Sequence, residues 1–284
     1  MNFFQSLASP IIHFADRANL ATCDFCGRSL LLKNPAARKA GIRMRSNWYC
    51  SSRCFTSVAE QEISSLMRST FCRTDPTPRM PLGLSLVSRG LLDENQFRRI
   101  ARKQKATGME FADLLIQDGV ISEEQLTSAR AALWGCPVFE VPNFPAPVDV
   151  SIPQRLVDAH EAVPLHYVRG TKTLLMGFLH SVEYGFLYAV ETVVGCKTQA
   201  CFVSPSGFQL GCEQRRRQLE SGEVVRAMEV SIDNAYGAGD MARTLCKMSV
   251  EFEADEAVVS KCKDYVWARL KNSDKEIDLV FTAS

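Results

Sequence analysis

PLGLSLVSRGLLDENQF, residues 81–97, is followed 29 residues further on by EFADLLIQDGVISEEQL, residues 110–126. Apolar residues occupy the same positions in both copies, and Gly90 in the first copy corresponds to Gly119 in the second. A fixed internal period marks a supersecondary unit that is used more than once. This repeat decides the fold of the central part of the chain.

Each copy predicts a short helix, a tight turn and a second helix. The apolar residues at i, i+4 and i+5, which lie on one helical face, are Leu82, Leu86 and Val87 in the first copy and Phe111, Leu115 and Ile116 in the second. Gly90 and Gly119 follow where a left-handed residue closes a last helical turn. Asp93 and Ser122 are candidate N-caps, each with a Gln at the capping-box spacing. We expect two helix–turn–helix units packed as a small bundle over residues 81–136.

The repeat resembles the N-terminal domain of the type II secretion and type IV pilus assembly ATPases, the GspE/MshE type. The family repeat opens Arg-Leu-Gly, continues with apolar pairs around a Gly and closes on Gln, and two copies bind cyclic di-GMP in some members. The resemblance implies a cyclic-di-GMP site. Its first-copy residues are Leu82, Gly83, Leu86, Val87, Gly90, Leu91, Leu92 and Gln104, and its second-copy residues are Phe111, Leu115, Ile116, Gly119, Val120 and Ile121.

The sequence departs from the family repeat where a phosphate would be held. Pro81 and Glu110 stand where the family has Arg, which removes bidentate phosphate contacts and adds a like charge. Ala112 replaces a Gly, and Leu133 replaces the closing Gln. Arg102 could supply charge from a neighbouring position. We favour a packing repeat with weak or absent binding, and a cyclic-di-GMP receptor is the alternative.

The resemblance continues through residues 137–211, which predict an α/β subdomain with a small mixed sheet. The expected elements are a helix at 154–160, strands at 162–168 and 173–178, a helix at 183–194 and a strand at 198–203. Residues 223–284 resemble the start of the domain that follows in those ATPases. We expect there a helix over 224–250, a strand over 256–270 and a hairpin partner at 277–281. Two linkers are predicted, residues 72–80 and the charged residues 212–222, where Arg215, Arg216 and Arg217 would lie in solvent.

Two close pairs of cysteines are the main feature of residues 1–71. Cys23 and Cys26 have the spacing of a zinc knuckle, and Cys50 and Cys54 form a second close pair before a predicted helix at 57–67. Four thiolates arranged in this way can converge on one zinc ion. The pattern resembles a treble-clef module and predicts a closed, structural zinc site, whose removal should unfold roughly the first seventy residues.

Several classes of protein lack support in the sequence. No Gly-x-x-x-x-Gly-Lys-[Ser/Thr] or other catalytic motif occurs, so we predict that the chain is not an enzyme. The remaining cysteines form no close pair, no signal peptide is recognisable and no apolar run reaches membrane length, which favours the cytoplasm and no membrane insertion. The net charge is +1, and the basic residues between the cysteine pairs are Arg28, Lys33, Arg38, Lys39, Arg43 and Arg45. Nucleic-acid binding by the zinc module therefore remains a second, less favoured alternative.

The sequence as a whole predicts an α+β protein with a four-cysteine zinc module, a two-repeat helical bundle, a small α/β subdomain and a C-terminal α/β tail. The resemblance implies a non-enzymatic accessory or regulatory protein. Its partner would be a protein of a type II secretion or type IV pilus machine.

Overall fold

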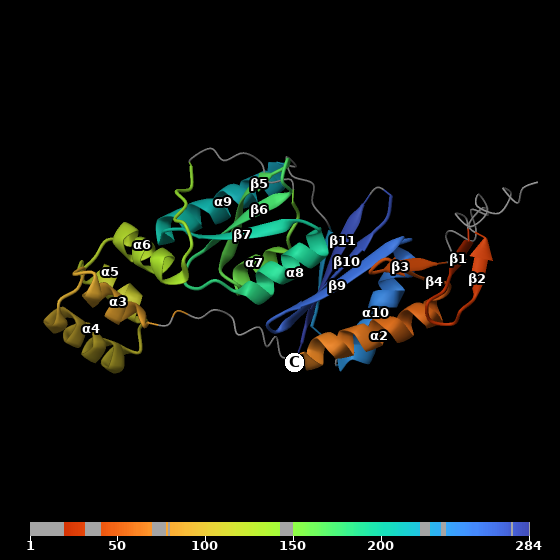
Figure 1. Ribbon diagram of the computed structural model, residues 1–284, viewed down its shortest axis with the longest axis horizontal. Coiled ribbons are helices and arrows are strands. Elements are labelled where there is room, and N and C mark those ends of the chain that lie inside the picture. The colour runs from red at the N-terminus through yellow and green to blue at the C-terminus, as the bar shows by residue number, and fades with distance from the viewer. Residues whose placement is uncertain are drawn as a thin grey trace, which may run out of the picture.

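The computed structural model describes residues 20–31, 41–69, 78, 80–142, 150–221, 228–233, 237–273 and 275–283. The fold is α+β, as predicted, and the molecule is elongated (Figure 1). The helical bundle lies at one end, the α/β subdomain next to it, a second sheet beyond that, and the cysteine-bearing hairpins at the other end. All but two residues of the predicted linker 72–80 lie outside the described residues.

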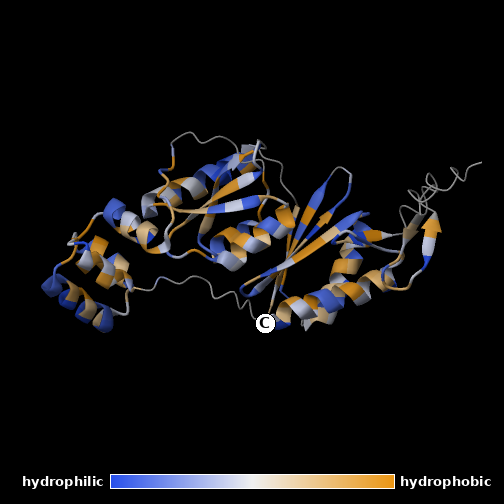
Figure 2. Cartoon of the chain, in the orientation of Figure 1, coloured by the Kyte–Doolittle hydropathy of each residue, from blue (hydrophilic) through white to orange (hydrophobic). Residues whose placement is uncertain are grey.

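The repeat forms the predicted bundle of four helices. These are α3 (Leu82–Ser88), α4 (Glu94–Thr107), α5 (Phe111–Gln117) and α6 (Glu123–Trp134). Leu86, Ile100, Leu114 and Leu115 are fully buried in its core. The outer helix α4 is coloured hydrophilic over most of its length (Figure 2), and among its residues only Ile100 is buried. The bundle therefore has a small hydrophobic core of its own.

The local signals that define the repeat are confirmed. Asp93 and Ser122 are the N-caps of α4 and α6, and each forms a full capping box with the Gln three residues on. Gly90 and Gly119 have φ angles of 69° and 63° and follow the ends of α3 and α5. Both turns therefore use the left-handed conformation that glycine adopts without strain.

Replacing Gly90 by Ala should lower the free energy of unfolding by about 1 kcal/mol, because a Cβ strains the left-handed conformation. Steric clashes add nothing to this loss of stability, since a Cβ at Gly90 would meet no atom within 4 Å. Gly185 is a matched control: a Cβ there also meets nothing, its φ is not left-handed and it lies in a helix. Urea unfolding should show Gly185→Ala to be neutral or stabilising, and equal effects of the two changes would contradict the assigned turn.

The α/β subdomain follows the predicted order. Its elements are α7 (Gln154–Ala159), β5 (Ala162–Val168), β6 (Thr173–Phe178), α8 (Tyr184–Val194), β7 (Lys197–Phe202) and α9 (Pro205–Ser221). Strand β6 lies between the other two, antiparallel to β5 and parallel to β7, which is the predicted mixed sheet.

Residues 212–222 are not a linker, which corrects the sequence interpretation. All of them except residue 222, which is not described, belong to α9. Arg215 is 5% exposed and donates a hydrogen bond of 2.7 Å to the carbonyl oxygen of Ile152. A run of charged residues favours solvent exposure, but the first arginine of this run is buried and fixes the chain segment that enters α7.

The N-terminal and C-terminal parts of the chain form one sheet. Its strand order is β4-β3-β9-β10-β11-β8. The strands are β3 (Ile42–Met44), β4 (Asn47–Tyr49), β8 (Met228–Ile232), β9 (Glu256–Cys262), β10 (Tyr265–Lys271) and β11 (Glu276–Thr282). The zinc module and the C-terminal tail, which the sequence interpretation treated as separate domains, are therefore a single structural unit.

Two secondary-structure predictions in the tail are wrong. Residues 228–232 form the strand β8 and not the first part of a helix, which begins only at α10 (Gly237–Glu251). Residues 256–270 form a hairpin, β9 and β10, instead of one strand, and Lys263 at its turn has a φ of 50°. The predicted pairing of 277–281 with the preceding strand is confirmed, since β11 is antiparallel to β10.

Helices cover both faces of this sheet (Figure 1). The long helix α2 (Ser52–Arg68) packs against α10, and both helices share a core with the sheet, in which Ile63, Leu245 and Leu279 are fully buried. On the other face, α8 packs on β9 and β10, and Trp267 and Val280 are buried together with Val190 of α8. The C-terminal sheet therefore connects the cysteine-bearing segment to the α/β subdomain.

Candidate functional site

Three local elements position the four predicted zinc ligands. Cys23 and Cys26 lie in the turn after β1 (Leu20–Thr22) and before β2 (Ser29–Leu31), where Gly27 has a φ of 71° and donates to the Cys23 carbonyl oxygen at 2.8 Å. Cys50 directly follows β4. Cys54 lies in the first turn of α2, and its N–H donates to the N-cap Ser51 Oγ at 3.3 Å.

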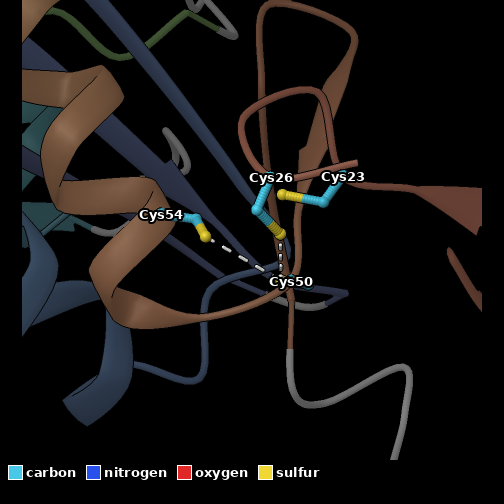
Figure 3. Close-up of side chains that lie close together, drawn as sticks. All are labelled: Cys23, Cys26, Cys50 and Cys54. Atoms are coloured by element: carbon cyan, nitrogen blue, oxygen red, sulfur yellow. Dashed lines mark hydrogen bonds between the residues drawn. The ribbon is translucent and has the colours of Figure 1, made fainter. Parts of the chain in front are cut away.

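The four thiols meet at one point (Figure 3). Their sulfur atoms all lie within 4.8 Å of one another. The Cys26–Cys50 separation is 3.5 Å and the Cys50–Cys54 separation is 3.9 Å. Four ligands on a tetrahedron with zinc–sulfur bonds of about 2.3 Å stand about 3.8 Å apart. The cluster therefore has the size and the donor set of a four-thiolate metal centre.

The protonation of the thiols also suits a metal. Burial raises the pKa of the Cys23 thiol, but backbone N–H donors of Cys50, Cys26 and Phe25 outweigh it and lower this pKa to about 6. Burial and hydrogen bonds with the thiols of Cys26, Cys23 and Cys54 raise the pKa of Cys50 to about 12. A bound dication would displace the proton of Cys50, because metal binding requires thiolates.

The cluster is part of the core and not of an isolated module. Cys23, Cys50 and Cys54 are buried in the same cluster as Met241 and Leu279, far along the chain. Cys246 of α10 lies beside it, with its Sγ 3.6 Å from the Ser52 carbonyl oxygen, but is not one of the four converging thiols. Spacing predicted that the four thiols converge, whereas their burial depends on strands and helices for which the sequence has no local pattern.

Of the basic residues between the cysteine pairs, the structure describes Arg28, Arg43 and Arg45. Arg28 and Arg43 are exposed, and Arg45 is paired with Glu62 of α2. Lys33, Arg38 and Lys39 lie outside the described residues, so nucleic-acid binding stays an untested alternative.

A cavity of about 990 Å³ opens where the bundle meets the α/β subdomain. Of the residues proposed for cyclic di-GMP, it is lined by Leu82, Gly83, Gln104 and Phe111. Gly83 allows close packing, because a Cβ there would lie 2.6 Å from the Phe97 ring. The replaced positions Pro81, Glu110, Ala112 and Leu133 line it as well.

The structure places the other proposed ligand residues elsewhere. Buried in the bundle core are Leu86, Leu92, Leu115 and Ile121, and packed against it are Val87, Leu91, Ile116 and Val120. Gly90 and Gly119 form the turns. Arg102 is exposed on α4 and is not among the residues that line the cavity. Most of the repeat residues therefore pack the bundle, and Arg102 does not lie where it could supply charge to the cavity.

Among the described residues that line the cavity, Arg130 of α6 is the one arginine. It is 8% exposed, and its Nη1 donates to the Leu179 carbonyl oxygen at 2.9 Å. Burial lowers the pKa of this guanidinium, and the nearby acids Asp113, Glu110 and Glu161 oppose that shift. Sequence reasoning missed Arg130, although an arginine four residues after the core residue Leu126 on one helical face was a usable signal.

Within the described ranges, no helix combines the length and the apolar character that crossing a membrane requires.

The similarity to one curated protein supports the resemblance. No family model matches the chain. The type IV pilus assembly ATPase PilB of Thermus thermophilus is 22% identical over 129 residues, which are 45% of this chain but only 14% of PilB. The structure of MshE with cdg, cyclic di-GMP, is 20% identical, covers 49% of this chain and 99% of that one and has a TM-score of 0.39. A structure of the N-terminal domain of XpsE is 17% identical, covers 48% of this chain and 92% of that one, and has a TM-score of 0.36. The match with PilB confirms that part of this chain is similar to a pilus assembly ATPase.

Proposed function

We propose that this chain is an accessory or regulatory protein without a catalytic reaction, which acts by protein–protein contact at a type II secretion or type IV pilus machine. The similarity to PilB supports the choice of machine. The 284 residues contain no P-loop, so the phosphate cradle that such an ATPase needs is missing from this chain. Ten described cysteines are free thiols, which suits the reducing cytoplasm.

One observation carries the choice of protein contact over second-messenger binding. Pro81 and Glu110, which replace the two expected arginines, both line the cavity. Arg130 is its only arginine among the described lining residues, and it already donates to a backbone carbonyl. A ligand with two phosphate charges would face Glu110 and Glu161 with little compensation.

Calorimetric titration with cyclic di-GMP should therefore give no heat signal at several hundred micromolar ligand, that is, a Kd weaker than about 1 mM. The double variant Pro81→Arg/Glu110→Arg restores both expected arginines in the same cavity and should bind measurably. Micromolar or tighter binding by the wild-type protein would instead make the chain a cyclic-di-GMP receptor and overturn the proposal.

Partner contact is tested in the cell. The chain would be crosslinked in its own host and its partners identified by mass spectrometry. We expect secretion or pilus components to be enriched relative to those crosslinked to an unrelated protein of equal abundance. The absence of such enrichment would contradict the proposal.

We propose further that the four cysteines hold one structural zinc ion, since all four positions of a tetrahedral site would be filled by protein. Purified protein should contain about one equivalent of zinc by metal analysis, and Cys50→Ser should lose most of it. Cys246→Ser is the control, because Cys246 lies beside the cluster without belonging to it. Less than half an equivalent in the wild type, unchanged by Cys50→Ser, would exclude the site.

A further inference from the structure

The cavity of the bundle has an exposed apolar rim. Met80 is 43% exposed and Leu84 is 51% exposed, and both line the opening. Behind them lie the half-buried rings of Phe97, Phe111 and Trp134. Exposed apolar side chains next to a hydrophobic cavity are typical of a surface that another molecule covers.

Two acidic groups lie among the residues that line this cavity. Glu110 comes from the start of α5 and Glu161 from the turn before β5, and both are exposed. His180 lies 3.7 Å from the Glu161 carboxylate. The one described arginine of the lining, Arg130, is buried and donates to the Leu179 carbonyl oxygen. An entering molecule therefore meets two exposed carboxylates and one buried guanidinium.

We infer that this cavity binds a basic, amphipathic segment of a partner protein. Apolar side chains of the segment enter between Leu84 and Trp134, and Lys or Arg side chains lie against Glu110 and Glu161. An amphipathic helix in a hydrophobic groove is a common mode of peptide recognition, and the long stems of Lys and Arg cover apolar surface while their charges stay in solvent. This inference rests on the proposed function and specifies the surface through which it acts.

The geometry favours a polypeptide over a small ligand. The volume of about 990 Å³ is at the upper end of the usual range of ligand pockets, roughly 300–1,000 Å³. The exposed apolar side chains Met80 and Leu84 lie at the opening, so an occupant that covers them must extend outside it. The carboxylates of Glu110 and Glu161 would attract Lys or Arg side chains on the part of the occupant that lies outside the cavity.

Trp134 gives a direct readout. The probe is an amphipathic peptide of leucine and lysine, about 18 residues or five helical turns long, and its partner probe has glutamate in place of lysine. Tryptophan emission of the full chain should shift on titration with the lysine peptide and give a Kd at least about tenfold tighter than with the glutamate peptide. Trp134→Phe should remove the spectral change, because Trp267 is fully buried elsewhere and Trp48 lies on β4, at the end of the molecule opposite the bundle (Figure 1).

Two variants locate the binding. Leu84→Asp should weaken the binding of the lysine peptide about tenfold or more. Glu110→Lys should reduce or reverse the preference for the lysine peptide over the glutamate peptide. Val250→Asp is the matched control, because Val250 is 62% exposed on α10, away from the bundle. Circular dichroism of each variant confirms that it is folded.

The inference fails if neither peptide binds, if both bind equally, or if Val250→Asp weakens binding as much as Leu84→Asp. These failures leave the proposed function intact as long as secretion or pilus components are still crosslinked to the chain. Tight binding of cyclic di-GMP by the wild type would contradict the proposed function itself, whatever the peptides do.

Discussion

Removal of the proposed zinc ion from the four-cysteine cluster is expected to loosen the C-terminal sheet together with the hairpins that carry the cysteines. Strand β3 pairs with β9, and the Arg43 N–H donates to the Asp255 carbonyl oxygen at 2.9 Å. Structural zinc contributes about 10–16 kcal/mol to the folding of zinc-finger peptides, which equals or exceeds the stability of a typical domain, about 5–15 kcal/mol. Hydrogen exchange with and without chelator should show lost protection in α2, β9 and α10.

The bundle provides the internal control for this experiment. The buried core residues of α3, α4 and α5 form a separate cluster, whereas Ala131 of α6 also packs in the cluster that contains Trp267. Helices α3 to α5 should therefore keep their protection when the proposed metal is removed. Cys50→Ser should reproduce the effect of chelation, and Cys246→Ser should not. The sequence alone suggested that only about seventy residues would unfold. A loss of protection confined to residues 20–69 would support that narrower expectation and contradict the shared core.

The sequence predicts the bundle well because its signals are local. A capping residue, a glycine with positive φ and a helical apolar stripe act within a few residues of one another, so Asp93, Gly90 and Leu86 could be assigned without knowledge of the rest of the chain. The four cysteines could be assigned for the same reason. Their spacing within each pair is short, and the ligand geometry of zinc needs only those pairs.

What the sequence could not predict depends on contacts between distant segments. The pairing of the edge strand β8 with β11 could not be predicted, although the alternation of Met228, Val230 and Ile232 with Glu229 and Ser231 was a usable strand signal. The β9–β10 hairpin turns at Lys263 and Asp264 without a glycine, so the usual turn signal is absent. Arg130 reaches a carbonyl oxygen 49 residues away, and Arg215 one 63 residues away. A buried arginine is recognised only when its acceptor is known.

Breaking the buried ion pair of the C-terminal sheet should have the second large effect. Arg269 and Asp278 face each other on β10 and β11 and are 2% and 1% exposed. The guanidinium donates to both carboxylate oxygens, at 2.7 and 2.8 Å, and the Trp267 indole N–H donates to the same carboxylate at 2.8 Å. Arg269→Met leaves a buried carboxylate without its countercharge. We expect the free energy of unfolding to fall by about 3–5 kcal/mol in urea titrations.

Two variants separate the ion pair from simple loss of packing. Arg269→Met/Asp278→Leu removes both charges and should recover most of the loss, because burying two charges costs desolvation that an apolar pair avoids. Lys271→Met is the exposed counterpart on the same strands, since Lys271 lies 3.4 Å from Glu276 and both are partly in solvent. It should cost less than about 1 kcal/mol. Arg269 also donates to the Ser151 carbonyl oxygen at 2.6 Å and pairs with Glu276 at 3.2 Å, and the double variant leaves the Trp267 indole N–H without its acceptor. A double variant that stays less stable than the wild type therefore reports the loss of these three contacts together. Equal stability of Arg269→Met and Lys271→Met would show that the buried pair does not stabilise the unit.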